Sequence, residues 1–292
     1  MTSSSILDAE VLIQRVAERI PLLIHPHVVV IGSIACAWAF RDVSQTAAVV
    51  TKDIDILLRP SVDAVTNAMA LGERLLDEGW RPMFPNDIAR GSEQTPTDEL
   101  PALRLSPADG TSWFLELLAE PPEGQSDRKH WRRLVTEHGH FGLPSFRYMR
   151  VATHDAELTT FGLRVARPAQ MALAHLLEHA DPDRTEVRAS GLPRYIKDVG
   201  RAVALWWLAQ EQSVFAAENW AMAWRNALDD LYPTERNIRL INAKRGLMSV
   251  ESSLVDAHAL TARSVLAPHG TDVRAFERAY RSLLDLTASV LT

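Results

Sequence analysis

The sequence has little cysteine, no long apolar run and no excess of positive charge. Its 292 residues include one cysteine, Cys36, which excludes an internal disulfide and any zinc site built from several cysteines. No apolar stretch approaches the ~18 residues of a membrane-spanning helix, and the first residues lack the basic and apolar regions of a signal peptide. We therefore expect neither a membrane span nor a signal peptide, and a cytoplasmic protein.

The overall composition excludes further classes. A formal net charge of −6 argues against a broadly basic surface that coats nucleic acid, although a local basic patch would still be compatible with an RNA or DNA substrate. Apolar residues make up 47% of the chain and charged residues 23%, which excludes wholesale disorder. The sequence has no convincing repeat, no low-complexity tract and no Gly-x-Ser-x-Gly elbow, so a Ser-His-Asp hydrolase is disfavoured.

A buried strand that ends in a tight turn is predicted at residues 28–33. Three valines and an isoleucine precede Gly32 and Ser33, and residues 34–40 have the composition of a short packed helix. Gly32 lets the backbone approach a ligand closely, Ser33 adds a hydroxyl, and the start of a helix favours phosphate oxygens. The alternative is an ordinary turn without a ligand.

Residues 51–58 alternate acidic and apolar side chains. In a strand this pattern places Asp53 and Asp55 on one face, with Ile54 and Ile56 on the other. Two carboxylates at this spacing repel each other unless a cation lies between them, and oxygen ligands suit Mg²⁺. The alternative is a solvated strand edge.

The combination of Gly32-Ser33 and Asp53-Ile54-Asp55 resembles the signature of the DNA polymerase β-type nucleotidyltransferase superfamily. With Thr51 included, it resembles the Thr-x-Asp-apolar-Asp variant of nucleotidyltransferase-like toxins in abortive-infection and toxin–antitoxin systems. The gap between Ser33 and Asp53 is longer than is usual in the family, and an insertion through residues 41–50 accounts for it.

The resemblance implies a substrate, a cofactor and partners. We expect transfer of an NMP from an NTP such as ATP to a hydroxyl acceptor on an RNA end, a protein or a small molecule. The cofactor implied is Mg²⁺ or Mn²⁺, and a toxin of this type has a cognate antitoxin as a partner.

A third carboxylate is predicted on a later strand. Turn residues at 107–110 separate two apolar segments, 100–105 and 112–118, which indicates a hairpin. Glu116 lies inside the second segment, where burying an acid is costly unless it is paired or bound to metal. The resemblance implies that Glu116 helps bind metal or acts as general base, and the alternative is a solvent-facing strand edge.

The pattern becomes helical from Pro168, which predicts two domains. We expect an α/β (α+β) nucleotidyltransferase-type domain with a mixed sheet and flanking helices over residues 1–166, and an all-α domain over 167–292. The segment 194–201 opens a long helix and resembles the Lys-Asp-x-x-Asp helix of the toxins, with Arg201 where an aspartate is usual. The resemblance implies that Lys197 and Asp198 lie near the nucleotide, and an ammonium would neutralise triphosphate oxygens. The alternative is a charge pair on the helix surface.

Three further segments carry weaker signals. Residues 129–133 and 138–140 are basic and rich in histidine, and we interpret them as a solvated loop. Residues 148–151 are predicted to add an edge strand. Four tryptophans of the helical half are interpreted as core residues: Trp206, Trp207, Trp220 and Trp224.

Two other functions remain open at this stage. One is a catalytically degenerate member of the same superfamily that binds a nucleotide or a partner. The other is an interaction protein whose helical half docks a partner, which an apolar patch around the tryptophans and the absence of a cleft at Asp53 would favour.

Overall fold

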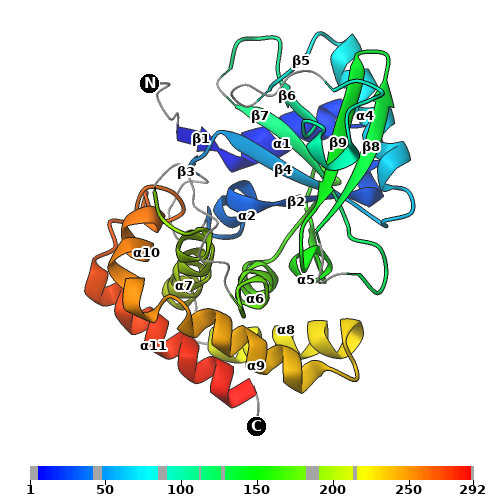
Figure 1. The fold of residues 1–292 in the computed structure, drawn as a ribbon. Coiled ribbons are helices and arrows are strands. Elements are labelled where there is room, and N and C mark those ends of the chain that lie inside the picture. Colours follow the sequence, from blue (N-terminus) through cyan, green and yellow to red (C-terminus); the bar gives the residue numbers. More distant parts are fainter. Residues whose placement is uncertain are drawn as a thin grey trace.

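The computed structural model describes residues 6–41, 48–84, 91–111, 113–125, 129–181, 191–212 and 216–290. These residues form a mixed α/β structure in which a sheet lies on one side of a group of helices (Figure 1). The predicted class, α/β with a mixed sheet, is confirmed. Residues 42–47 of the predicted insertion lie outside the described residues.

The main sheet has seven strands in the order β10-β11-β2-β4-β7-β6-β5. In that order the strands are Glu157–Leu158, Arg164–Val165, Val28–Ile31, Asp53–Leu58, Phe114–Ala119, Arg104–Ser106 and Arg81–Pro82. The central strand β4 is antiparallel to β2 and parallel to β7. Ile54 and Ile56 of β4 are completely buried, and the acidic residues of this strand project from the opposite face of the sheet.

Two smaller sheets flank this one. β1 (Ile6–Asp8) pairs with β3 (Ala48–Val50), so part of the predicted insertion is a strand. β8 (His130–Thr136) pairs with β9 (Gly139–Ser145) over seven residue pairs. The loop predicted at residues 129–133 and 138–140 is therefore wrong. The basic and histidine side chains line a hairpin, and Gly139 at its turn has a φ of 126°.

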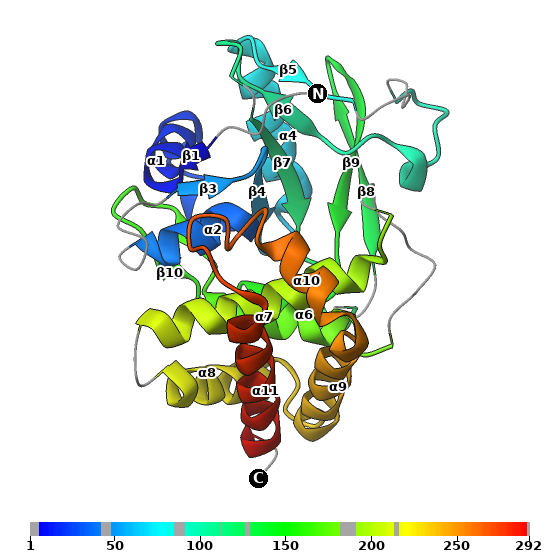
Figure 2. The ribbon, with the colours of Figure 1, turned by 90° about the vertical axis from the view of Figure 1, so that its left-hand side faces the viewer.

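The helices gather mainly on one side of the sheet. They are α1 (Ala9–Arg19), α2 (Gly32–Ala39), α4 (Ala64–Asp77), α5 (Met149–Ala152), α6 (Pro168–Glu178), α7 (Arg194–Gln212), α8 (Ala216–Leu231), α9 (Arg236–Met248), α10 (Leu254–Thr261) and α11 (Val273–Val290). Figure 2 shows α2 between the sheet and α7, with α8, α9 and α11 beyond α6 and α7. The helices from α6 to α11 thus form one layer, which we call the helical wall. Helix α2 lies between this layer and the sheet.

The edge strand predicted at residues 148–151 is wrong, because this segment contains helix α5. Tyr148 adopts a φ of 58°, in the left-handed region, which breaks the extended chain leaving β9. The following turn is helical, and the Thr153 hydroxyl donates a hydrogen bond to the Met149 carbonyl at 3.0 Å. This turn places residues 146–149 beside the helical wall.

The tryptophans of the helical half are core residues, as predicted. Trp206, Trp220 and Trp224 are buried and contact one another edge-on or tilted, and Trp207 is partly buried. The indole of Trp224 donates a hydrogen bond to the Ala169 carbonyl at 2.8 Å, which ties α8 to α6. Within the described ranges, no helix combines the length and the apolar character that crossing a membrane requires.

Gly246 allows α9 to pack directly against α6. A Cβ at this position would overlap the Leu176 carbonyl oxygen, which belongs to the backbone of α6 and cannot move aside easily. We expect Gly246→Ala to lower the free energy of unfolding by about 1–3 kcal/mol, because overpacking costs more than the gain of about 1 kcal/mol in helix propensity. Chemical denaturation monitored by circular dichroism measures this difference.

Gly72 in α4 provides the matched control. A Cβ there would meet only a methyl group of Leu103, at 2.8 Å, which is the movable end of a side chain. Gly72→Ala is therefore expected to change stability by less than about 1 kcal/mol. Equal effects of the two substitutions would contradict the close contact between α6 and α9.

Candidate functional site

The turn from β2 into α2 lies directly against the acidic strand β4. Gly32 is the first residue of α2 and has a φ of 72°, which L-residues with a side chain adopt only with strain. A Cβ at Gly32 would also collide with the carboxylate of Asp55. Two separate features therefore require glycine at position 32: the positive φ of the backbone and the close approach of the Asp55 carboxylate. Ser33 follows it and is buried.

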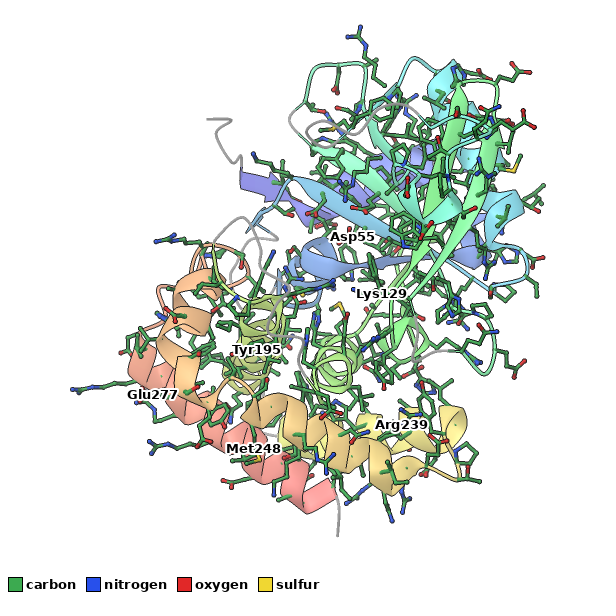
Figure 3. The ribbon with its side chains drawn as sticks, in the orientation of Figure 1. Asp55, Lys129, Tyr195, Arg239, Met248 and Glu277 are labelled. Carbon is green, nitrogen blue, oxygen red and sulfur yellow. The ribbon has the colours of Figure 1, made fainter. Side chains whose placement is uncertain are left out.

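Asp53 and Asp55 project from the same face of β4, as their spacing predicts. Asp55 pairs with Ile31 of β2 on one side and with Glu116 of β7 on the other. The Thr51 hydroxyl donates a hydrogen bond of 2.5 Å to Asp53 Oδ1 and so fixes that carboxylate. Figure 3 shows Asp55 on the sheet, above α2 and the helical wall.

Glu116 completes a group of three carboxylates. It lies on β7 directly beside Asp55, and oxygen atoms of Asp53, Asp55 and Glu116 lie within 4.8 Å of one another. Glu116 is only 8% exposed, so the solvent-facing alternative is wrong. Arg104 lies opposite Glu116 on β6 and donates two hydrogen bonds to its carboxylate, each of 3.1 Å.

Asp55 is the carboxylate of this group whose charged form is disfavoured. The pKa of Asp55 is raised well above its ordinary value, first because the carboxylate is removed from water and second because Asp53 and Glu116 are negative neighbours. Arg201 and Arg104 act in the opposite direction and lower this pKa. A cation bound by this group would relieve the repulsion that remains.

The sheet carboxylates open into a cavity of about 670 Å³ whose opposite wall is formed by α6, α7 and the segment after α10. All seven residues predicted from the sequence line this cavity: Gly32, Ser33, Asp53, Asp55, Glu116, Lys197 and Asp198. The structure therefore brings together residues that are up to 166 positions apart in the chain. Their roles stay predictions.

Asp198 is a buried carboxylate rather than a surface one. It is 3% exposed, accepts a hydrogen bond of 2.9 Å from Arg194 Nε, and has His179 Nε2 at 3.3 Å. Lys197, beside it on α7, lines the cavity and is partly buried. This arrangement differs from the alternative considered for Lys197 and Asp198, which was a charge pair on the surface of the helix.

The sequence interpretation missed several cavity residues. Arg104, His175, Glu178 and Arg263 line the site but belong to no motif in the sequence, and Arg201 was noted only as a departure from a motif. Burial lowers the pKa of His175 to about 3, so its imidazole is neutral at physiological pH. The only sequence signal for this group is the three-residue spacing of His175 and Glu178, which places both on one face of a helix.

Comparisons with known proteins identify neither a family nor a function for this site. No protein-family model, no curated protein and no solved structure matches the chain. The resemblance to nucleotidyltransferases therefore rests on the residues named above, and the function is argued from the site.

Proposed function

We propose that this protein is a metal-dependent nucleotidyltransferase that transfers an NMP from an NTP to a hydroxyl acceptor. The observation that carries the proposal is the convergence of three elements on one cavity. These are the Gly32-Ser33 turn at the start of a helix, the Asp53/Asp55 pair, and Glu116 on the neighbouring strand. A phosphate-binding turn beside a carboxylate cluster is the equipment of phosphoryl and nucleotidyl transfer.

The donor set fits the metal that the resemblance implies. Asp53, Asp55 and Glu116 offer only oxygen ligands within 4.8 Å of one another, and hard cations such as Mg²⁺ or Mn²⁺ prefer oxygen. The ion would supply positive charge to the triphosphate and to the leaving pyrophosphate. The raised pKa of Asp55 supports this fit, since a desolvated carboxylate between two others is stabilised by a cation.

The remaining roles fall to groups of the chain itself. The first N–H groups of α2 and the Ser33 hydroxyl would hold the terminal phosphates, and the Lys197 ammonium would neutralise β- and γ-oxygens. Glu116 would accept the proton of the acceptor hydroxyl while its oxygen attacks the α-phosphorus in line. The bond between the α-phosphorus and the bridging oxygen breaks, and pyrophosphate leaves with that oxygen. Asp198 stands beside Lys197 near the nucleotide.

Cations around the cavity support an anionic substrate. Arg147 and Arg263 line the cavity and are exposed, and no described residue forms a hydrogen bond or ion pair with either guanidinium. Unpaired guanidinium groups bind phosphate oxygens in pairs of hydrogen bonds. The acceptor belongs to RNA, protein or a small molecule, and in a toxin–antitoxin system this cytoplasmic enzyme would have an antitoxin partner.

One observation favours a second candidate, a degenerate member that binds a nucleotide or a partner without chemistry. Arg104 donates hydrogen bonds to both oxygens of Glu116, so these oxygens are already engaged by a cation and are less available to a metal ion or to the acceptor hydroxyl. Asp53 and Asp55 carry no such pair among the described residues, so nucleotide binding would persist in a degenerate protein. The third alternative, an interaction protein, would be favoured by an exposed patch around the tryptophans and by the absence of a cleft at Asp53. Neither is observed, because Trp206, Trp220 and Trp224 are buried and Asp53 lines a cavity.

Calorimetry of the wild-type chain with each of the four NTPs, with and without Mg²⁺, tests the proposal. We expect one NTP to bind with an affinity that rises at least about tenfold when Mg²⁺ is present, a difference of about 1.4 kcal/mol. An NTP labelled at the α-phosphorus then distinguishes the two candidates, because only an enzyme transfers the label to an acceptor in an RNA, protein or metabolite fraction. Absence of NTP binding under both conditions would contradict both.

A further inference from the structure

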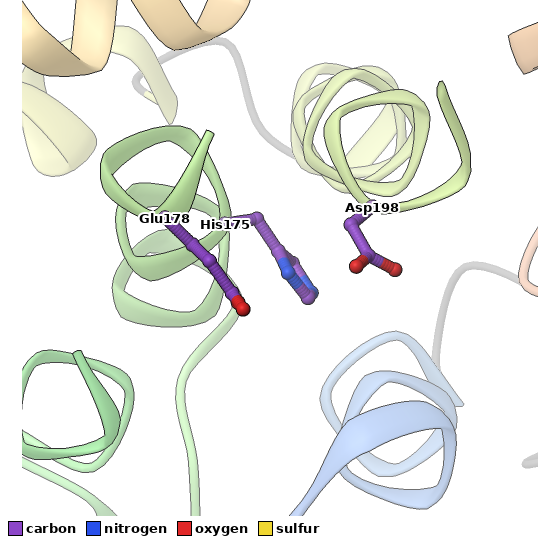
Figure 4. Close-up of side chains that lie close together, drawn as sticks. All are labelled: His175, Glu178 and Asp198. Atoms are coloured by element: carbon purple, nitrogen blue, oxygen red, sulfur yellow. The ribbon is translucent and has the colours of Figure 1, made fainter. Parts of the chain in front are cut away.

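A second group of metal-ligating side chains lies on the helical wall of the cavity. His175 and Glu178 come from α6, three residues apart on one face, and Asp198 comes from α7, which packs against α6. One ligand atom of each residue lies within 4.8 Å of the others. Figure 4 shows the imidazole of His175 between the two carboxylates. This group shares no residue with the carboxylates on the sheet.

The surroundings of Asp198 hold its carboxylate in place. Arg194 donates to it at 2.9 Å, and His179 Nε2 lies 3.3 Å from the same oxygen. Arg194 also lies 3.7 Å from Glu178, so one positive charge faces two carboxylates within this group. Partners of this kind orient metal ligands in known sites, where they act from outside the coordination sphere.

His175 has no such partner. No residue in the described ranges exchanges a hydrogen bond with its imidazole, although the side chain lines the cavity between two acidic residues. An imidazole that is oriented toward carboxylates and open to a cavity is suited to coordinate a metal ion. The cavity also provides space for water molecules to complete the coordination.

We propose that His175, Glu178 and Asp198 bind a divalent transition metal ion of the Zn²⁺ type. One imidazole nitrogen combined with carboxylate oxygens suits Zn²⁺ and its neighbours in the first transition row, whereas Mg²⁺ prefers oxygen ligands alone. Arg194 and His179 would remain as the outer partners of Asp198. The site differs from the sheet carboxylates in its ligands and in the metal it prefers, although it lines the same cavity and includes Asp198, which the proposed nucleotidyl transfer also places near the nucleotide.

Titration of the 292-residue chain with Co²⁺ tests the site, because Co²⁺ replaces Zn²⁺ and absorbs visible light in a way that depends on its ligands. The titration is carried out in excess Mg²⁺, which occupies an all-oxygen site. We expect about one equivalent of Co²⁺ to bind with visible absorption bands, and Zn²⁺ to displace it. His175→Ala is expected to weaken Co²⁺ binding more than about 100-fold, since loss of an outer partner alone costs about 10–100-fold.

Three further variants make the result specific. Glu178→Gln keeps the shape of the side chain and is expected to weaken Co²⁺ binding at least about tenfold, which tests the site even if His175→Ala fails to fold. His138→Ala removes a histidine from the β8–β9 turn and is expected to leave binding unchanged. The double variant Asp53→Asn/Asp55→Asn is expected to keep the Co²⁺ bands.

Two outcomes would overturn the inference. One is Co²⁺ affinity that is unchanged in folded His175→Ala or in Glu178→Gln. The other is Co²⁺ absorption that disappears in Asp53→Asn/Asp55→Asn, which would place the ion on the sheet. Neither outcome depends on NTP binding, so the metal site and the proposed function fail separately.

Discussion

Replacing both Asp53 and Asp55 by asparagine is expected to lower the Mg²⁺-dependent affinity for NTP by at least about 100-fold. The substitution keeps the size of both side chains but removes two of the three charges that would hold the cation, and even outer partners of a metal contribute about 10–100-fold. Calorimetry of the double variant against wild type, with the NTP that binds best, measures the loss. Asp63→Asn removes an exposed carboxylate of the same protein and should bind as wild type does.

The same carboxylates should affect stability in the opposite direction. In EDTA, Asp55→Asn is expected to raise the melting temperature, because it removes a desolvated charge that lies beside Asp53 and Glu116. The raised pKa means that the folded protein binds more protons than the unfolded chain, so this residue makes stability fall as pH rises. The difference between variant and wild type should vanish below about pH 4 and grow as pH rises through the raised pKa.

These two measurements separate a binding site from an ordinary ion cluster. In a cation-binding site, substitution of the carboxylates is expected to raise the melting temperature in the absence of metal and to abolish NTP binding. A double variant that binds NTP as well as wild type in the presence of Mg²⁺ would remove Asp53 and Asp55 from the site. A variant that is less stable in EDTA would mean that Arg201 and Arg104 outweigh the repulsion.

Local patterns were sufficient to predict the sheet side of the site. The run of β-branched residues before Gly32 and the alternation from Asp53 to Ile56 are properties of single strands, and β2 and β4 follow them closely. Glu116 was recognisable because an acid inside an apolar strand must find a partner. These inferences needed no knowledge of how the strands pair.

The parts that escaped prediction depend on tertiary contacts. Arg104 meets Glu116 because the turn between β6 and β7 sets their register, which residue patterns do not specify. The β8–β9 hairpin was mistaken for a loop because most residues of β8 are only partly buried and show no apolar alternation. His175 and Glu178 gain a possible role only when α6 packs against α7 beside the sheet.

Gly32→Ala is expected to combine a loss of stability with a loss of NTP binding. The substitution places a Cβ against the carboxylate of Asp55, in a backbone conformation with a φ of 72°. The conformation alone costs about 1–2 kcal/mol, and the collision adds about 1–3 kcal/mol, because the Asp55 carboxylate lies at the end of a short side chain and must turn away beside Asp53 and Glu116. Thermal or denaturant unfolding measures the first effect, and calorimetry with NTP and Mg²⁺ measures the second.

Gly124→Ala is the control that separates the effect of the collision from the effect of the backbone strain. It has the same φ of 72°, but a Cβ there would meet nothing within 4 Å. Gly124→Ala should therefore lower stability by only about 1–2 kcal/mol and leave NTP binding unchanged. If Gly32→Ala costs no more than this and still binds NTP, the turn does not approach Asp55 closely enough to share a ligand with it. If Gly32→Ala loses more stability than Gly124→Ala and also loses NTP binding, the proposed phosphate-binding turn and the proposed metal-binding strand must lie in direct contact at Gly32.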